Sequence, residues 1–203
     1  GSATGFSFDV SFNKKNFNIS SSIGKLNEKG SVLGTGTGGL LDLGSGDTIY
    51  LDNRVSYKLT NDINIQFNFI TSQTKTNNRN EQSFIKDITD IYSNAYSINA
   101  DYKSFSFSIS RPLTVYSGDM TYAYSDFNLV PKTKGGYGLS SKYYLDKVSL
   151  SPNKELRFVG TYRKNLGIFT DSVFNFIYRV NPDGFTDKNE TILMMKLSHR
   201  LGI

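Results

Sequence analysis

Hydrophobic and polar residues alternate along most of this chain. The stretch from Thr48 to Gln73, "TIYLDNRVSYKLTNDINIQFNFITSQ", follows this pattern for most of its length and pauses only at Asn61 and Asp62. Because successive side chains of a β-strand point to opposite faces, such alternation gives a strand one apolar and one polar face. The stretch therefore predicts a β-hairpin of two amphipathic strands joined by a short turn.

The same two-residue period recurs from one end of the chain to the other and predicts about eleven strands. The segments are 6–13, 17–26, 48–60, 63–75, 92–103, 105–111, 117–125, 137–150, 155–163, 169–180 and 191–203. Near Ser83 to Ser93, "SFIKDITDIYS" instead fits a short helix in a loop. We expect an all-β fold, an antiparallel up-and-down β-barrel of about 10–12 strands, with residues 1–203 forming a single domain.

The connections between the expected strands differ in length. Those near 14–16, 61–62 and 103–104 are tight, whereas 27–47 and 76–91 are long and polar. Short turns at one end and long loops at the other are typical of transmembrane barrels. The connections therefore favour a barrel that crosses a membrane.

Two later connections break this alternation. Residues 126–136 form a long connection where a short turn is due, and 151–154 form a short one where a long loop is due. Bacterial barrels usually contain an even number of strands, so eleven segments indicate either a further strand upstream or a miscounted segment.

Composition sets further limits on the class of protein. The chain has no cysteine, which excludes disulfides and thiol chemistry. No apolar run approaches the roughly 18 residues of a membrane helix, so any spanning would need strands of about 9–11 residues. We find no signal peptide and expect the chain to be the mature part of a longer protein.

The net charge of +5 raises the question of nucleic-acid binding. Such binding requires Lys and Arg gathered on one face and interleaved with exposed aromatic residues. Here the basic residues are spread over nearly every segment, usually near Asp or Glu. We therefore expect no nucleic-acid partner.

Charged residues occupy the polar side of the expected strands, and aromatic residues occupy the other side. In a closed membrane barrel the charges would line a hydrated lumen and the aromatic rings would face lipid. The inverse arrangement, with the rings inside, describes a soluble barrel or sandwich and fits the same pattern. We expect a net basic lumen, and the candidate lumen-lining residues are Arg54, Lys58, Lys142, Arg157, Arg163, Arg179, Lys196 and Arg200.

The sequence offers little for catalysis. A serine protease triad needs a histidine, and the only one, His199, lies in the last expected strand, where we interpret it as structural. One histidine without cysteine argues against a zinc site, which usually needs three or four nitrogen or sulfur ligands. The "GTGTGG" run of Gly34 to Gly39 matches a dinucleotide fingerprint but lacks the βαβ frame, so we interpret it as a loop. We expect no catalytic residue, metal site or cofactor.

Three stretches carry a resemblance to a known family. "KLNEKGSVLGTGTGGLLDLGSGDTIYL", "FSISRPLTVYSGDM" and "VSLSPNKELRFVGTYRKNL" occur in this order and cover most of the chain from Lys25 onward. They resemble, in turn, the Gly-rich entry segment, a Pro-Leu hairpin and a Leu-Ser-Pro turn of the C-terminal region of subtilisin-like autotransporter serine proteases. One departure is the terminal Ile203, because outer-membrane strands commonly end in Phe or Trp.

The resemblance implies an outer-membrane β-barrel translocator domain that anchors or exports an N-terminal passenger. That passenger would be a subtilisin-like protease, so any enzymatic activity would lie outside this chain. The implied partners are outer-membrane lipid, the passenger or its linker, and the outer-membrane assembly machinery, and the implied location is the bacterial outer membrane. The alternative is a secreted or periplasmic soluble β-barrel or β-sandwich that serves as an accessory or ligand-binding domain.

Overall fold

The computed structural model describes residues 2–32, 43–77, 83–133, 135–151, 154–167, 170–182 and 188–199. In these residues the fold is all-β, and every strand pairs with its neighbours in antiparallel fashion. No helix in this part of the chain is long and apolar enough to cross a membrane. The predicted all-β, antiparallel fold class is confirmed.

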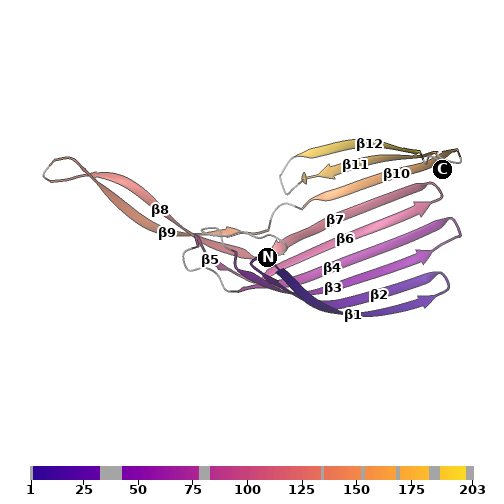
Figure 1. Ribbon diagram of the computed structural model, residues 1–203, viewed down its shortest axis with the longest axis horizontal. Helices are drawn as coiled ribbons and strands as arrows, with labels where there is room; N and C mark the ends of the chain where they lie inside the picture. Colours follow the sequence, from indigo (N-terminus) through magenta and orange to yellow (C-terminus); the bar gives the residue numbers. More distant parts are fainter. Residues whose placement is uncertain are drawn as a thin grey trace.

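Nine strands form one large sheet, in the order β1-β2-β3-β4-β6-β7-β10-β11-β12 (Figure 1). Their bounds are β1 Ser2–Lys14, β2 Phe17–Lys29, β3 Ser45–Lys58, β4 Ile63–Asn77, β6 Ile91–Tyr102, β7 Phe105–Ser117, β10 Leu156–Gly167, β11 Thr170–Val180 and β12 Asn189–His199. Among the described strands β1 and β12 have one neighbour each, so the sheet is open and is not closed into a barrel.

A second sheet of three strands has the order β5-β8-β9. It consists of β5 (Ile85–Ile88), β8 (Asp119–Pro131) and β9 (Tyr137–Ser149). The hairpin of β8 and β9 projects beyond one end of the large sheet (Figure 1). The sequence correctly predicted these two strands but placed them within the barrel, next to the others.

The helix expected near Ser83 to Ser93 is wrong, because this segment contains β5 and the first residues of β6. Ile85 and Ile88 are three residues apart, which is the spacing of neighbours on one face of a helix. Both are nevertheless buried in the same small core, and the β5–β8 register shifts between Ile85 and Asp87. A β-bulge adds one residue to a strand, so residues three apart can share a face.

All tight turns lie at one end of the large sheet. The turns at 15–16, 59–62 and 103–104 join neighbouring strands there, and β10 ends at Gly167 only shortly before β11 begins. Lys15 and Lys103 have φ values of 48° and 51°, in the left-handed region that two-residue hairpin turns use. We call this the turn end of the sheet.

The long connections all lie at the opposite end, which we call the loop end. They join β2 to β3, β4 to β6, β7 to β10 and β11 to β12. The β8–β9 hairpin is part of the connection between β7 and β10, so the irregular lengths noted near 126–136 and 151–154 do not interrupt the sheet. In the nine strands of the sheet the predicted alternation of tight and long connections holds throughout.

The buried apolar core is small and lies near the base of the projecting hairpin. Val32, Ile85, Ile88 and Ile91 form it, and Leu43, Val115, Met120 and Leu150 pack against it. The accessible surface of the chain is 13950 Å², whereas a compact monomer of this mass exposes about 9,500 Å². Most of the large sheet is therefore not covered by a core of its own.

Candidate functional site

The register of the large sheet assigns every side chain to one of two faces. Directly opposite residues of neighbouring antiparallel strands share a face. One such row crosses all nine strands and is almost entirely apolar: Phe12, Ile19, Val55, Phe67, Ile98, Ile109, Phe158, Tyr178 and Thr191. We call the side that carries it the apolar face.

The adjacent row lies on the opposite side, which we call the polar face. Its members are Ser11, Ser20, Arg54, Asn68, Ser97, Ser110, Arg157, Arg179 and Glu190. Within it, Asn68 donates a hydrogen bond of 2.9 Å to the hydroxyl of Ser97. The division into faces that alternation predicted for the hairpin from Thr48 to Gln73 is confirmed by these registers.

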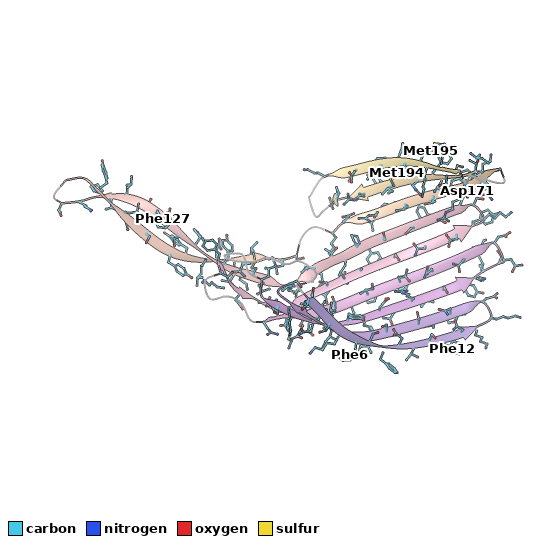
Figure 2. All side chains as sticks on the ribbon, in the orientation of Figure 1. Phe6, Phe12, Phe127, Asp171, Met194 and Met195 are labelled. Atoms are coloured by element: carbon cyan, nitrogen blue, oxygen red, sulfur yellow. The ribbon has the colours of Figure 1, made fainter. Side chains whose placement is uncertain are left out.

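Many large side chains of the apolar face are exposed, and on the interior strands β4 and β11 they are more exposed than their neighbours on the polar face. On β4, Phe67 is 41% exposed, while its neighbours Gln66 and Asn68 are only partly exposed. On β11, Phe176 is 47% exposed and Asn175 is less so. At the β1 edge, the labelled side chains of Phe6 and Phe12 point away from the sheet (Figure 2). Large apolar side chains are mostly buried in soluble monomers, so the exposure of these rings points to contact with a further apolar surface or medium.

Six of the eight predicted lumen-lining residues lie on the polar face. They are Arg54, Lys58, Arg157, Arg163, Arg179 and Lys196. Lys142 does not join them, because it lies on β9 opposite Asp126 and therefore outside the large sheet. The alternation pattern alone does not show which sheet a strand belongs to, so it grouped Lys142 with the rest. Arg200 and the Gly34 to Gly39 run lie outside the described residues.

Two of these arginines belong to a charge cluster at the loop end, which we call the Glu155 cluster. Glu155 accepts hydrogen bonds from Arg157 (Nη2 to Oε1, 2.9 Å) and from Arg179 (Nε to Oε1, 2.8 Å). Arg179 also donates to Glu190 (Nη1 to Oε2, 2.7 Å). The side chains of Glu155 and Arg179 are only 8% and 16% exposed. The cluster links β10, β11 and β12 and contains equal numbers of positive and negative charges.

The prediction of a net basic polar face does not hold for the described strands. Six cations lie there, listed above, and Arg54 among them pairs with Asp52 at 2.8 Å. The registers and the Glu155 cluster place seven carboxylates on the same face: Asp9, Glu28, Asp52, Asp101, Glu155, Asp171 and Glu190. Glu28 and Glu190 stand at or just outside the limits of the predicted strands, so their face was not assigned from the pattern.

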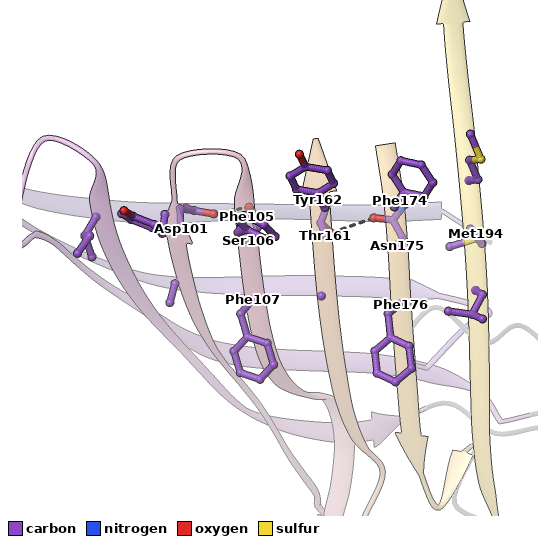
Figure 3. A pocket seen from close by; sticks show the side chains of 16 residues that line it. Asp101, Phe105, Ser106, Phe107, Thr161, Tyr162, Phe174, Asn175, Phe176 and Met194 are labelled. Carbon is purple, nitrogen blue, oxygen red and sulfur yellow. Dashed lines mark hydrogen bonds between the residues drawn. The ribbon is translucent and has the colours of Figure 1, made fainter. Parts of the chain in front are cut away.

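The apolar face contains a groove of about 750 Å³. Its floor is at Gly160 on β10, whose absent side chain leaves a hollow between Phe107 and Phe176 on the two flanking strands (Figure 3). The rings of Tyr162 and Phe105 line the groove nearer the turn end, and their centroids are 4.7 Å apart. Its volume is typical of sites for small apolar ligands, and the lining is almost wholly apolar.

Other candidate chemistry is limited. In the described part of the chain, no three His, Asp or Glu side chains lie in an arrangement that could hold a metal ion. The backbone of His199 is at the end of β12, opposite Thr170. The structure therefore offers two extended surfaces, one apolar and one polar and charged.

No known protein family, curated protein or solved structure matches this chain. The similarity to subtilisin-like autotransporters therefore remains a prediction that rests on the three sequence stretches.

Proposed function

We propose that this chain is the membrane-inserted β-domain of a bacterial outer-membrane protein that anchors or exports an N-terminal passenger. The observation that carries the proposal is the exposure of the apolar face. A sheet of nine strands with exposed rings on one side needs an apolar medium on that side, because the hydrophobic effect disfavours their contact with water. Bilayer hydrocarbon supplies that medium.

The arrangement of the connections supports the same proposal. Short turns at one end and long loops at the other are typical of outer-membrane barrels, in which the turns face the periplasm. The strands of the large sheet contain 11 to 15 residues, enough to cross a bilayer when tilted, which takes about 9–11.

The directions of the edge strands define how the sheet would close. β1 and β12 both run from the loop end to the turn end, so direct pairing of these two strands would be parallel. An all-antiparallel barrel therefore needs an odd number of additional strands between them. Closure by strands of the same longer protein would remove both open edges, which otherwise expose unpaired backbone groups.

The polar face would then line a hydrated interior. Side chains such as Asn68, Asp101 and Arg163 are suited to contact with water and with the polar backbone of a linker. The Glu155 cluster, at the loop end, lies where such a linker would leave the barrel. The work of this domain would be to hold a passenger at the cell surface rather than to catalyse a reaction.

Membrane insertion is testable with the purified chain and phospholipid vesicles. The chain should integrate into vesicles, resist extraction by urea and carbonate, and run faster on SDS gels before heating than after. A monodisperse monomer in plain buffer that ignores vesicles would contradict the proposal. That result would favour a soluble β-protein that holds an apolar ligand in the groove at Gly160.

A further inference from the structure

The β8–β9 hairpin carries an exposed apolar surface of its own. Its side chains lie on one face of the hairpin by register and are 60% to 71% exposed: Phe127, Leu129, Tyr137, Leu139, Tyr143 and Leu145. The position of Phe127 on the projecting hairpin is labelled in Figure 2. An isolated two-stranded hairpin is at best marginally stable in water, and one with six exposed apolar side chains is less so. We call the six exposed side chains listed above the hairpin apolar surface.

We infer that the hairpin apolar surface binds bilayer hydrocarbon, and that β8 and β9 enter the large sheet between β7 and β10 when the domain is in a membrane. This inference rests on the membrane insertion proposed above and deepens it. The inserted sheet would have the order β1-β2-β3-β4-β6-β7-β8-β9-β10-β11-β12. The apolar face would then extend without interruption over eleven strands.

The hairpin would insert where two neighbouring strands of the large sheet share the fewest paired positions. We call the boundary between two neighbouring strands a seam. β7 and β10 share only six paired positions, from Phe105 with Tyr162 to Ser110 with Arg157. Every other pair of neighbouring strands in that sheet shares ten or more. The half of β7 from Arg111 to Ser117 lies beyond the part that pairs with β10. Separating β7 from β10 therefore breaks fewer backbone hydrogen bonds than opening any other seam.

The hairpin fits this seam in direction and length. β7 runs to the loop end and β10 returns from it, so β8 and β9, placed between them in chain order, keep all neighbours antiparallel. β7, β8 and β9 contain 13 residues each. β7 and β8 are separated only by Gly118, so a short hairpin turn there can join them as neighbours in the sheet. Gly118 already has a φ of 147°, a backbone conformation that other residues rarely adopt.

The membrane changes the balance between the two arrangements. Insertion gives up the six β7–β10 positions and the short pairing of β8 with β5. In return, the outer edges of β8 and β9 gain partners along β7 and β10. In water those edges can bind solvent, whereas in hydrocarbon an unpaired backbone group has no partner at all. The projecting arrangement is thus favoured only outside the bilayer.

Cysteine pairs can distinguish the two arrangements, because the chain has no cysteine of its own. Ser108 on β7 lies opposite Asn99 on one side and Val159 of β10 on the other. Insertion of two strands would separate β7 from β10 by about 14 Å at roughly 4.8 Å per strand. A disulfide requires Cα atoms closer than about 7 Å. In vesicles, S108C with N99C should crosslink, and S108C with V159C should not.

Tryptophan fluorescence supplies a positive readout, since the chain also lacks tryptophan. Leu139→Trp lies on the hairpin apolar surface, and the neighbouring Ser140→Trp, on the other side of the hairpin, is the matched control. In vesicles of phosphatidylcholine with brominated acyl chains, Leu139→Trp should be quenched strongly and Ser140→Trp weakly. Phe67→Trp reports on the large sheet.

The outcomes separate this inference from the proposed function. Quenching of Phe67→Trp without quenching of Leu139→Trp would show that the sheet is in the membrane and would refute the inserted hairpin. Crosslinking of S108C to V159C in vesicles as readily as to N99C would also refute the inserted hairpin. If neither Phe67→Trp nor Leu139→Trp is quenched, both proposals fail. Quenching at both positions together with loss of the S108C–V159C crosslink supports the inserted hairpin.

Discussion

The phenol ring of Tyr50 covers Gly24, the residue directly opposite it on the neighbouring strand. A Cβ atom added to Gly24 would lie 2.5 Å from Cζ and Oη of that ring, too close for any real side chain. The ring thus occupies the space that a side chain at Gly24 would need. Pairing an aromatic residue with a glycine across two strands is a known means of stabilising glycine in a sheet.

Gly24→Ala should lower the stability of the domain by about 1–3 kcal/mol, because the Tyr50 ring must leave its position. The measurement is the midpoint of urea unfolding in detergent micelles. In a Tyr50→Ser background the same alanine should have little effect, since the obstructing ring is gone. Equal losses in both backgrounds would show that the two residues are not coupled.

Gly160→Ala is the matched control for that experiment. A Cβ atom at Gly160 meets nothing within 4 Å, because the residue forms the floor of the groove on the apolar face. Alanine also restricts the unfolded chain, so this variant should be unchanged or more stable by up to about 1 kcal/mol. A loss of stability at Gly160 would indicate that the groove is closed in the folded domain.

Glu155→Gln should destabilise the domain by about 2 kcal/mol, because the neutral amide leaves Arg157 and Arg179 without their shared carboxylate. Asp52→Asn is the control, since its partner Arg54 has a side chain that is 59% exposed. An exposed pair of this kind contributes less than about 1 kcal/mol. Urea unfolding of both variants at low and high salt compares them, and similar losses for the two would contradict a special role for the Glu155 cluster.

Phe67→Arg should cost about 2–4 kcal/mol if the apolar face meets the bilayer midplane, whereas the adjacent Asn68→Arg should be mild because the polar face is hydrated. The two positions differ by one residue on β4 and point to opposite faces. Reversible unfolding from vesicles gives the free energies. The assignment of faces is wrong if Asn68→Arg is the more damaging of the two.

A pore formed by this domain should show weak ion selectivity. In the described part of the chain the polar face carries seven carboxylates against six cations, so no single sign of charge dominates the field along it. Reversal potentials across a salt gradient in a planar bilayer measure this directly. The double variant Glu155→Gln, Glu190→Gln should shift the preference toward anions. Strong anion selectivity of the unchanged protein would instead support the charge balance expected from the sequence.

Much of this architecture could be predicted from local pattern. The two-residue period located eleven of the twelve strands that the described residues form. It also assigned residues such as Phe67 and Arg157 to their faces, because the direction of a side chain in a strand depends only on its position. The tight turns were recognisable because the alternation pauses at them. The missed strand, β5, has its two buried isoleucines at helical spacing, which only its bulge reconciles with a strand.

Pairing partners could not be predicted in this way. Whether β7 pairs with β8 or with β10 is decided by contacts between residues distant in sequence, and both choices satisfy the same alternation. The charge balance of the polar face was missed for a related reason. Glu190 lies one residue before the expected last strand, and its contact with Arg179 follows from the β11–β12 register. The spacing of residues within one strand does not show which residues of the neighbouring strand lie opposite them.

The separation of tight turns from long connections also bears on how the sheet assembles in time. Hairpins β1–β2, β3–β4, β6–β7 and β10–β11 each close a loop of only a few residues, so the entropy lost on forming them is small and they should form first. The seams between these hairpins close much longer loops and should form later and more slowly. Hydrogen exchange during refolding should therefore protect residues in pairs of strands rather than singly. Growth by hairpins adds two strands at each step and keeps every pair of neighbouring strands antiparallel.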